Sequence, residues 1–150
     1  MRYYAVPFDR ERVAAWIDWA RTSYAAHGFG LWAVLRRSDG HFLGDCGPML
    51  QPVEGAAVPE IGYHVVRSEQ GRGYATEAAR ACLEWVFDHT TYGSVCSLVS
   101  PDNEPSRAVA AKVHDSMREI VWEKNRRLTC LYWTDRPPPA QYLMRGSTTA

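Results

Sequence analysis

The most informative stretch of the chain is residues 60–87, which read EIGYHVVRSEQGRGYATEAARACLEWVF. Its first seven residues include Ile, Tyr and two Val, a composition typical of a strand. A polar, glycine-containing segment follows at 68–74, and apolar residues then recur at helical spacing from Ala75 to Phe87. The pattern predicts a strand, a turn and a helix that rests one side on a sheet.

The turn between that strand and that helix has the features of a phosphate-binding site. Backbone N–H groups at the start of a helix point outward without partners, and the helix dipole adds partial positive charge there. Gly71 and Gly73 have no Cβ, so the backbone can approach a ligand closely. Arg67 and Arg72 add positive charge at the flanks. The sequence therefore predicts that this turn holds a phosphate group.

Two common nucleotide motifs fit this turn poorly. A dinucleotide fingerprint requires Gly or Ala where this chain has Thr76, and no acidic residue closes the next strand. A Walker loop is excluded because Gly-Lys-Ser/Thr is missing from the turn. An ordinary strand-to-helix connection without a ligand remains an alternative, as does another kind of nucleotide-binding α/β domain.

Local patterns upstream of Glu60 predict a helix, a hairpin and a loop. Asp9 is a suitable N-cap, apolar residues then recur at steps of three and four, and Gly28 is a suitable C-terminal residue. The β-like runs 31–36 and 41–50 are separated by Ser-Asp-Gly, so we expect an antiparallel pair. Residues 52–59 (PVEGAAVP) are expected to form a loop.

Downstream, the short apolar run 95–99 is expected to be a buried strand parallel to the one at Glu60, which completes a βαβ unit. A turn at 101–106 leads into a predicted helix over 106–115. The runs 118–123 and 128–133 are expected to pair as a final hairpin.

Length and composition indicate a single ordinary domain. The chain has 150 residues, 46% of them apolar and 23% charged, close to the averages of globular proteins. Seventeen basic residues balance seventeen acidic ones, so no net charge favours nucleic acid or an acidic membrane as a partner. We expect the domain to span residues 1–133 and the Pro-rich segment 134–150 to be a poorly ordered tail.

The four cysteines form no Cys-x-x-Cys pair, and no histidine lies at zinc-finger spacing, so we expect reduced, mostly buried thiols and no metal site. Charged residues interrupt the N-terminus before any signal-like apolar stretch, and no apolar run is long enough to span a bilayer. The expected location is the cytoplasm.

The glycine turn resembles the signature of a known family. Residues 70–75 (QGRGYA) are similar to the Gln/Arg-x-x-Gly-x-Gly/Ala signature of the GNAT N-acetyltransferases. Residues 60–63 (EIGY), 73–78 (GYATEA) and 103–106 (NEPS) extend the resemblance over Met1 to about Trp133. They point to the RimJ/RimL-like branch, which acetylates protein N-termini and other amines.

The resemblance implies an α/β GNAT fold, with a mixed, mostly antiparallel sheet and helices on both faces, and acetyl-CoA as co-substrate without a metal. By this resemblance, the backbone of Val65, Val66 and Arg67 contacts pantetheine, and Asn103 and Ser106 face the pantetheine and sulfur end. The pyrophosphate falls on Gln70, Gly71, Arg72, Gly73, Tyr74, Ala75 and Thr76, continuing to Ala78.

Direct attack of a neutral amine on the thioester requires an oxyanion donor, a base and an acid. A backbone N–H near Val65 or Val66 is the candidate oxyanion donor, and Glu60 is the candidate base. The candidate acid is Ser106, with Tyr132 as an alternative. Glu60 and His64 share one face of a strand, and the sequence leaves open whether it is the groove side. Two structural alternatives remain. Glu60 is then a solvated carboxylate at a strand edge, and the Ser106 hydroxyl only pairs with backbone donors at the start of its helix.

Two departures from the family pattern affect this prediction. The segment 112–116 (KVHDS) replaces a Lys-Leu-Gly-like helix end, and the start of the chain resembles a stretch that in relatives follows a first strand and helix. We therefore expect those two elements to be lacking, which exposes a sheet edge and allows a homodimer. The acceptor is a protein N-terminus or a small-molecule amine. A non-catalytic acyl-CoA-binding or protein-interaction module is the alternative function.

Overall fold

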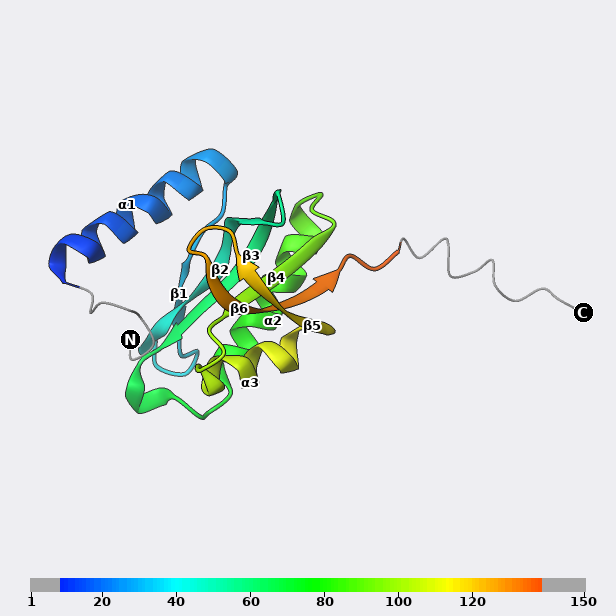
Figure 1. Cartoon of the computed structure of the whole chain (residues 1–150). Helices are drawn as coiled ribbons and strands as arrows, with labels where there is room; N and C mark the ends of the chain where they lie inside the picture. Colours follow the sequence, from blue (N-terminus) through cyan, green and yellow to red (C-terminus); the bar gives the residue numbers. More distant parts are fainter. Residues whose placement is uncertain (1–8, 139–150) are drawn as a thin grey trace, which may run out of the picture.

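The computed structural model describes residues 9–138, which form one six-stranded sheet and its helices (Figure 1). The elements are α1 (Arg10–His27), β1 (Trp32–Leu35), β2 (Phe42–Val53), β3 (Ala56–Val65), a 3-10 turn η1 (Arg67–Glu69), α2 (Tyr74–His89), β4 (Ser94–Val99), α3 (Glu104–Val113), β5 (Ser116–Trp122) and β6 (Arg127–Asp135). The strand order is β1-β2-β3-β4-β6-β5. Among the described strands, only the central pair β3 and β4 runs parallel. The predicted mixed, mostly antiparallel sheet is confirmed.

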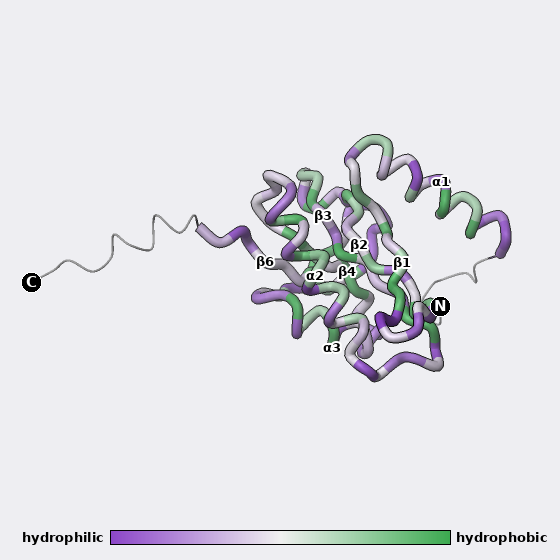
Figure 2. The backbone as a smooth tube through the Cα atoms, turned by 180° about the vertical axis from the view of Figure 1, so that it is seen from behind, coloured by the Kyte–Doolittle hydropathy of each residue, from purple (hydrophilic) through white to green (hydrophobic). Residues whose placement is uncertain are grey.

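The helices lie on both faces of the sheet. Buried residues of α2 pack with Cys46, Ile61 and Val95 from three central strands. The neighbours of Ile61 in β3 point the other way, and on that face the ring of His64 lies 5.2 Å from that of Trp16 in α1. In both views α1 stands apart from α2 and α3, and its hydropathy alternates along its length (Figure 2).

Two further buried clusters complete the core. Val99, Ala110, Cys130 and Tyr132 pack beneath α3, whereas Val53, Cys96 and Leu131 pack on the opposite face. All four cysteines are buried free thiols, as the sequence predicted.

The predicted first helix and first hairpin are confirmed. A carboxylate oxygen of Asp9 accepts a 2.8 Å hydrogen bond from the backbone N–H of Arg12, and Gly28 ends α1 at φ 76°. The antiparallel pairing of β1 with β2 follows. The four-residue strand β1 forms one edge of the described sheet. The expected absence of an earlier strand and helix concerns the chain before Asp9, outside the described residues, and the homodimer stays a prediction.

The predicted loop at 52–59 is wrong, because β2 and β3 continue through it as a hairpin. Glu54 and Gly55 form the turn with φ 53° and 81°, the two positive values of a type I′ connection. Pro52 and Pro59 discourage a strand prediction. In the structure, both fall at non-hydrogen-bonded positions of the β2–β3 ladder, since Val66 and Leu43 form a hydrogen-bonded pair and such pairs alternate.

The C-terminal boundary also needs correction. β6 runs to Asp135, two residues past the expected end of the domain. The guanidinium of Arg136 then donates hydrogen bonds of 2.6–3.0 Å to the carbonyl oxygens of Phe87, Thr90 and Tyr92. The first residues of the predicted tail are therefore part of the fold, and the segment 139–150 lies outside the described residues.

The link after α3 does not require a glycine. α3 ends at Val113, two residues earlier than predicted, and His114 is already extended at φ −107°. β5 starts at Ser116. An extended C-cap residue leads straight into the strand, so the missing left-handed glycine is no obstacle.

Candidate active site

The site is built on the divergence of the two parallel strands. β3 and β4 are paired only at Glu60 and Cys96, and beyond this point they separate. Because Val66 pairs with β2, the backbone groups of Val65 and Tyr63 point to the β4 side. The carbonyl of Ile61, on the same side, accepts a 3.0 Å hydrogen bond from the Ser97 hydroxyl of β4. The carbonyl of Val65 accepts a 2.9 Å hydrogen bond from the side chain of Gln70. At the divergence, the open side of β3 therefore offers the backbone of Tyr63 and the N–H of Val65.

Two cavities occupy this divergence. One, of about 330 Å³, extends from the glycine turn to α3, and the other, of about 200 Å³, lies between β3 and β4. Tyr63 and Ser106 line both, so the two cavities adjoin at these residues. Together they are called the groove here, and Glu60 lines its smaller part. Of the predicted cofactor residues, the larger cavity is lined by Val65, Gln70, Gly71, Gly73, Tyr74, Ala75, Thr76 and Ser106, and the smaller by Asn103 and Ser106.

The start of α2 has the backbone expected of an anion site. Gly71 and Gly73 adopt φ 76° and 87°, a region that favours glycine. No side chain caps Gly73, and the first hydrogen bond of α2 joins the N–H of Glu77 to the carbonyl of Gly73. The N–H groups of residues 74–76 consequently have no partner within the helix and face the cavity end of α2.

Five predicted cofactor residues lie outside the lining of these two cavities: Val66, Arg67, Arg72, Glu77 and Ala78. The N–H of Val66 donates a 2.8 Å hydrogen bond to the carbonyl of Leu43, so it cannot serve as the oxyanion donor. Val65 keeps that candidate role, since its N–H points toward β4. Arg67 is exposed at the start of η1, and Arg72 is exposed between the two glycines of the turn.

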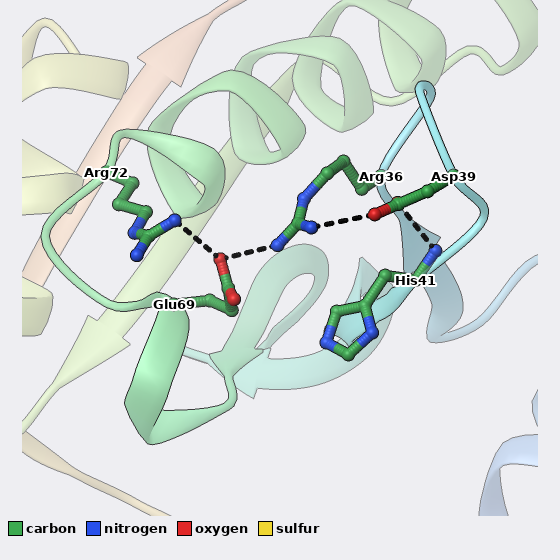
Figure 3. A network of polar contacts seen from close by, with 5 residues as sticks. All are labelled: Arg36, Asp39, His41, Glu69 and Arg72. Carbon is green, nitrogen blue, oxygen red and sulfur yellow. Dashed lines mark hydrogen bonds and ion pairs between the residues drawn. The ribbon is translucent and has the colours of Figure 1, made fainter.

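A polar network lies beside the glycine turn (Figure 3). Oε2 of Glu69 lies 2.8 Å from Nη2 of Arg36 and 3.3 Å from Nη1 of Arg72. Nη1 of Arg36 also donates a 2.9 Å hydrogen bond to Asp39, whose other oxygen accepts from the N–H of His41. The network therefore links the β1–β2 turn to the predicted phosphate site.

Glu60 is a half-buried carboxylate at the narrow end of the groove. Burial raises the pKa of Glu60, while hydrogen bonds from Gln51 and the Leu98 backbone and the charge of Lys124 oppose that rise. A raised pKa makes a carboxylate a stronger base near neutral pH. His64, on the same face as Glu60, lies 2.8 Å from Asp45 through Nδ1 and lines neither cavity.

Ser106 is at the junction of the two cavities, in the first turn of α3. Asn103 is the N-cap, and its side-chain oxygen accepts a 3.2 Å hydrogen bond from the N–H of Ser106. The hydroxyl of Tyr63 donates a 2.8 Å hydrogen bond to the carbonyl of Ser106. Burial raises the pKa of Tyr63. Tyr132 is buried under α3 and lines neither cavity, which favours Ser106 over Tyr132 as the acid.

Lys124, from the β5–β6 turn, brings a cation to the Glu60 side of the sheet. Its Nζ donates a 2.9 Å hydrogen bond to the side-chain oxygen of Gln51. The same Nζ lies 5.7 Å from the ring centre of Trp19 in α1 and 5.4 Å from that of Trp122. Two aromatic rings and an amide thus surround an ammonium group close to the candidate base.

Comparison with known proteins identifies the family. Residues 1–114 match the model described as the acetyltransferase (GNAT) domain. The chain belongs to the GNAT family. YkkB of Bacillus subtilis (strain 168) is 37% identical over 126 residues, which cover 83% of this chain and 73% of YkkB.

Solved GNAT structures share the fold. The acetyltransferase of Agrobacterium tumefaciens str. C58 gives a TM-score of 0.74 at 24% identity, over 85% of this chain and 73% of that chain. RimL, a ribosomal L7/L12 alpha-N-protein acetyltransferase solved with coenzyme A, gives 0.65 at 16% identity, over 85% and 73%. This likeness shows the shared fold, and the RimJ/RimL-like branch stays a prediction.

The groove of this GNAT domain fits the co-substrate that the family uses. An extended pantetheine chain matches the backbone of Tyr63 and the N–H of Val65, and a pyrophosphate matches the N–H groups of residues 74–76 at the start of α2. Within residues 9–138, no three His, Cys, Asp or Glu side chains are grouped so as to hold a metal ion. Over the same residues, no helix is long and apolar enough to cross a membrane.

Proposed function

We propose that this GNAT protein transfers an acetyl group from acetyl-CoA to a primary amine by direct attack. The observation that carries the proposal is the pair of adjoining cavities, one at the exposed N–H groups of α2 and the other lined by Glu60. The acceptor is the N-terminus of a protein or a small-molecule amine. RimL, which shares the fold, bears the name of an enzyme of the first kind.

Each residue of the groove has one task in this reaction. The N–H groups at residues 74–76 hold the pyrophosphate, and the backbone of Tyr63 and Val65 aligns pantetheine so that the thioester reaches the divergence of β3 and β4. The N–H of Val65 stabilises the oxyanion that forms on the thioester carbonyl.

Two proton transfers complete the reaction. Glu60 accepts a proton from the attacking amine as the C–N bond forms, directly or through a water molecule. The C–S bond then breaks, and the hydroxyl of Ser106 donates a proton to the departing thiolate while the proton held by Glu60 returns to Ser106 through water, so both side chains regain their starting state. The products are an amide and coenzyme A, so no other reactant is needed.

The test combines direct binding with turnover. Calorimetry measures CoA binding, and release of free thiol is followed with acetyl-CoA and a library of N-terminal peptides, polyamines and aminoglycosides. Thiol release that depends on one amine class supports the proposal and names the acceptor. Binding without turnover on any amine favours the non-catalytic module instead, and failure to bind CoA contradicts both.

A further inference from the structure

Glu69 places a negative charge where a phosphate is expected to bind. It lines the larger cavity next to the glycine turn, and its side chain is only 11% exposed. A carboxylate in this position repels an incoming phosphate, and a buried carboxylate without a cation is costly. The affinity of the turn for an anion therefore depends on what neutralises Glu69.

Two arginines contact Glu69, and they differ in how firmly they are held. Arg36 lies 2.8 Å from Oε2 of Glu69 and is 26% exposed, while Arg72 lies 3.3 Å from the same atom and is 59% exposed. Arg36 is also held by Asp39 at 2.9 Å and by the side chain of Tyr74. Arg36 is a fixed partner of Glu69, whereas Arg72 can leave at a smaller cost.

The two partners come from different parts of the fold. Arg36 belongs to the turn between β1 and β2, while Glu69 ends η1 and Arg72 lies between the two glycines of the turn (Figure 3). The contact between Arg36 and Glu69 thus ties the segment before the glycine turn to the turn between β1 and β2.

We propose that Arg36 is a positioning residue for the phosphate site: it neutralises and holds Glu69, so that Arg72 exchanges Glu69 for a phosphate of CoA. Without Arg36, Glu69 keeps Arg72 as its only arginine partner and repels the phosphate. This inference rests on the proposed function, because it requires CoA to bind at the glycine turn. Arg36 itself need not touch the cofactor.

A double-mutant cycle tests this role by calorimetry with CoA under reducing conditions. Arg36→Met is expected to weaken CoA binding about tenfold, the size of one charge-assisted contact. In a Glu69→Gln background there is no carboxylate at position 69 to neutralise. The same Arg36→Met change is then expected to alter the affinity for CoA by less than about twofold. Arg37→Met removes the charge of the neighbouring, exposed arginine and is the matched control, with unchanged CoA affinity.

The outcomes separate the possible roles. An equal loss from Arg36→Met in both backgrounds means that Arg36 acts through Asp39, Tyr74 or the ligand itself, and overturns the proposal. Unchanged CoA affinity in Arg36→Met overturns it as well. Melting temperatures of the free variants show whether each is folded, and a folded Arg36→Lys variant is expected to recover part of the affinity. If the unaltered protein does not bind CoA, the proposed function fails, and this result is distinct from a failure of the cycle.

Discussion

The hydroxyl of Tyr63 lies 2.8 Å from the carbonyl oxygen of Ser106, and this hydrogen bond joins β3 to the first turn of α3 across the groove. Tyr63→Phe removes only the hydroxyl. The loss is expected to cost about 1 kcal/mol of stability and, because the groove is no longer fixed at its junction, to lower kcat/KM for acetyl-CoA about tenfold. Thermal melting and thiol-release kinetics measure the two effects.

The matched control for Tyr63→Phe is Tyr24→Phe. The Tyr24 hydroxyl donates a comparable 2.6 Å hydrogen bond to the carbonyl of Leu31, away from the groove. A similar stability loss with unchanged kinetics is expected for Tyr24→Phe. If both variants affect the kinetics alike, Tyr63 has no special place in the site.

Glu60→Gln tests the candidate base. The substitution keeps the shape and removes the proton acceptor, so kcat is expected to fall about 100-fold or more while CoA affinity stays within about twofold of its original value. Glu84→Gln, an exposed change on α2, serves as the control. A Glu60→Gln enzyme with nearly full kcat would show that Glu60 is not the base.

The charge of Lys124 predicts a shift in the pH profile. Lys124 stabilises the ionised form of Glu60, so Lys124→Met raises the pKa of Glu60. Because the base must be ionised, the acidic limb of the kcat/KM profile moves to higher pH, and activity at low pH falls while the plateau is kept. Lys124→Arg preserves the charge and is expected to leave the limb in place. A limb that does not move in Lys124→Met contradicts the assignment of Glu60 as the titrating base.

Local patterns in the sequence predicted the elements around the glycine turn and the ends of α1, because caps, helical spacing and short turns are local signals. The hairpin at Glu54 and Gly55 was missed because prolines flank it, and only strand pairing shows that they sit where no N–H is needed. The role of Arg136 was missed for a similar reason, since its three carbonyl partners lie more than forty residues earlier in the chain.

For the candidate site as well, local features were predicted from the sequence and contacts between distant residues were not. Gly71 and Gly73 form a local motif, so the sequence alone predicts a phosphate turn there, and both glycines adopt the positive φ of such a turn. Tyr63 and Glu69 were missed as site residues because their partners, Ser106 and Arg36, are distant in sequence. Val66 was assigned wrongly because the register of β3 against β2 determines which N–H groups remain available.

The positive φ of Gly73 gives a test of the phosphate turn. At φ 87°, a Cβ meets no atom within 4 Å, so Gly73→Ala costs backbone strain alone, about 1 kcal/mol. The strain displaces the N–H groups at the start of α2, and CoA binding is expected to weaken about tenfold. Gly55→Ala, at φ 81° and equally free of contacts, carries the same strain in the β2–β3 turn. Calorimetry should show weaker CoA binding only for Gly73→Ala, and equal weakening in both would mean that general destabilisation is the cause.

His114 makes the fold sensitive to acid. It is buried, its Nε2 lies 3.0 Å from the Ser97 hydroxyl, and that hydroxyl donates to the carbonyl of Ile61. The Ser97 oxygen can therefore accept a hydrogen bond from Nε2–H of His114. A neutral ring with its proton on Nε2 makes this hydrogen bond. Burial lowers the pKa of His114 to about 4.

The sign of this effect on stability follows from proton binding. Below pH 6.5 the unfolded chain binds a proton on His114 that the folded protein does not bind until about pH 4. Stability is therefore lost as the pH falls through this window, by about 3 kcal/mol in total. Urea unfolding gives the free energy of unfolding at pH 7 and pH 4.5. The loss of this free energy between the two pH values should be smaller for His114→Gln than for the unaltered protein. His89 is exposed on α2, and His89→Gln should leave the loss as it is in the unaltered protein. Equal losses for the unaltered protein and His114→Gln would mean that other groups cause the acid sensitivity.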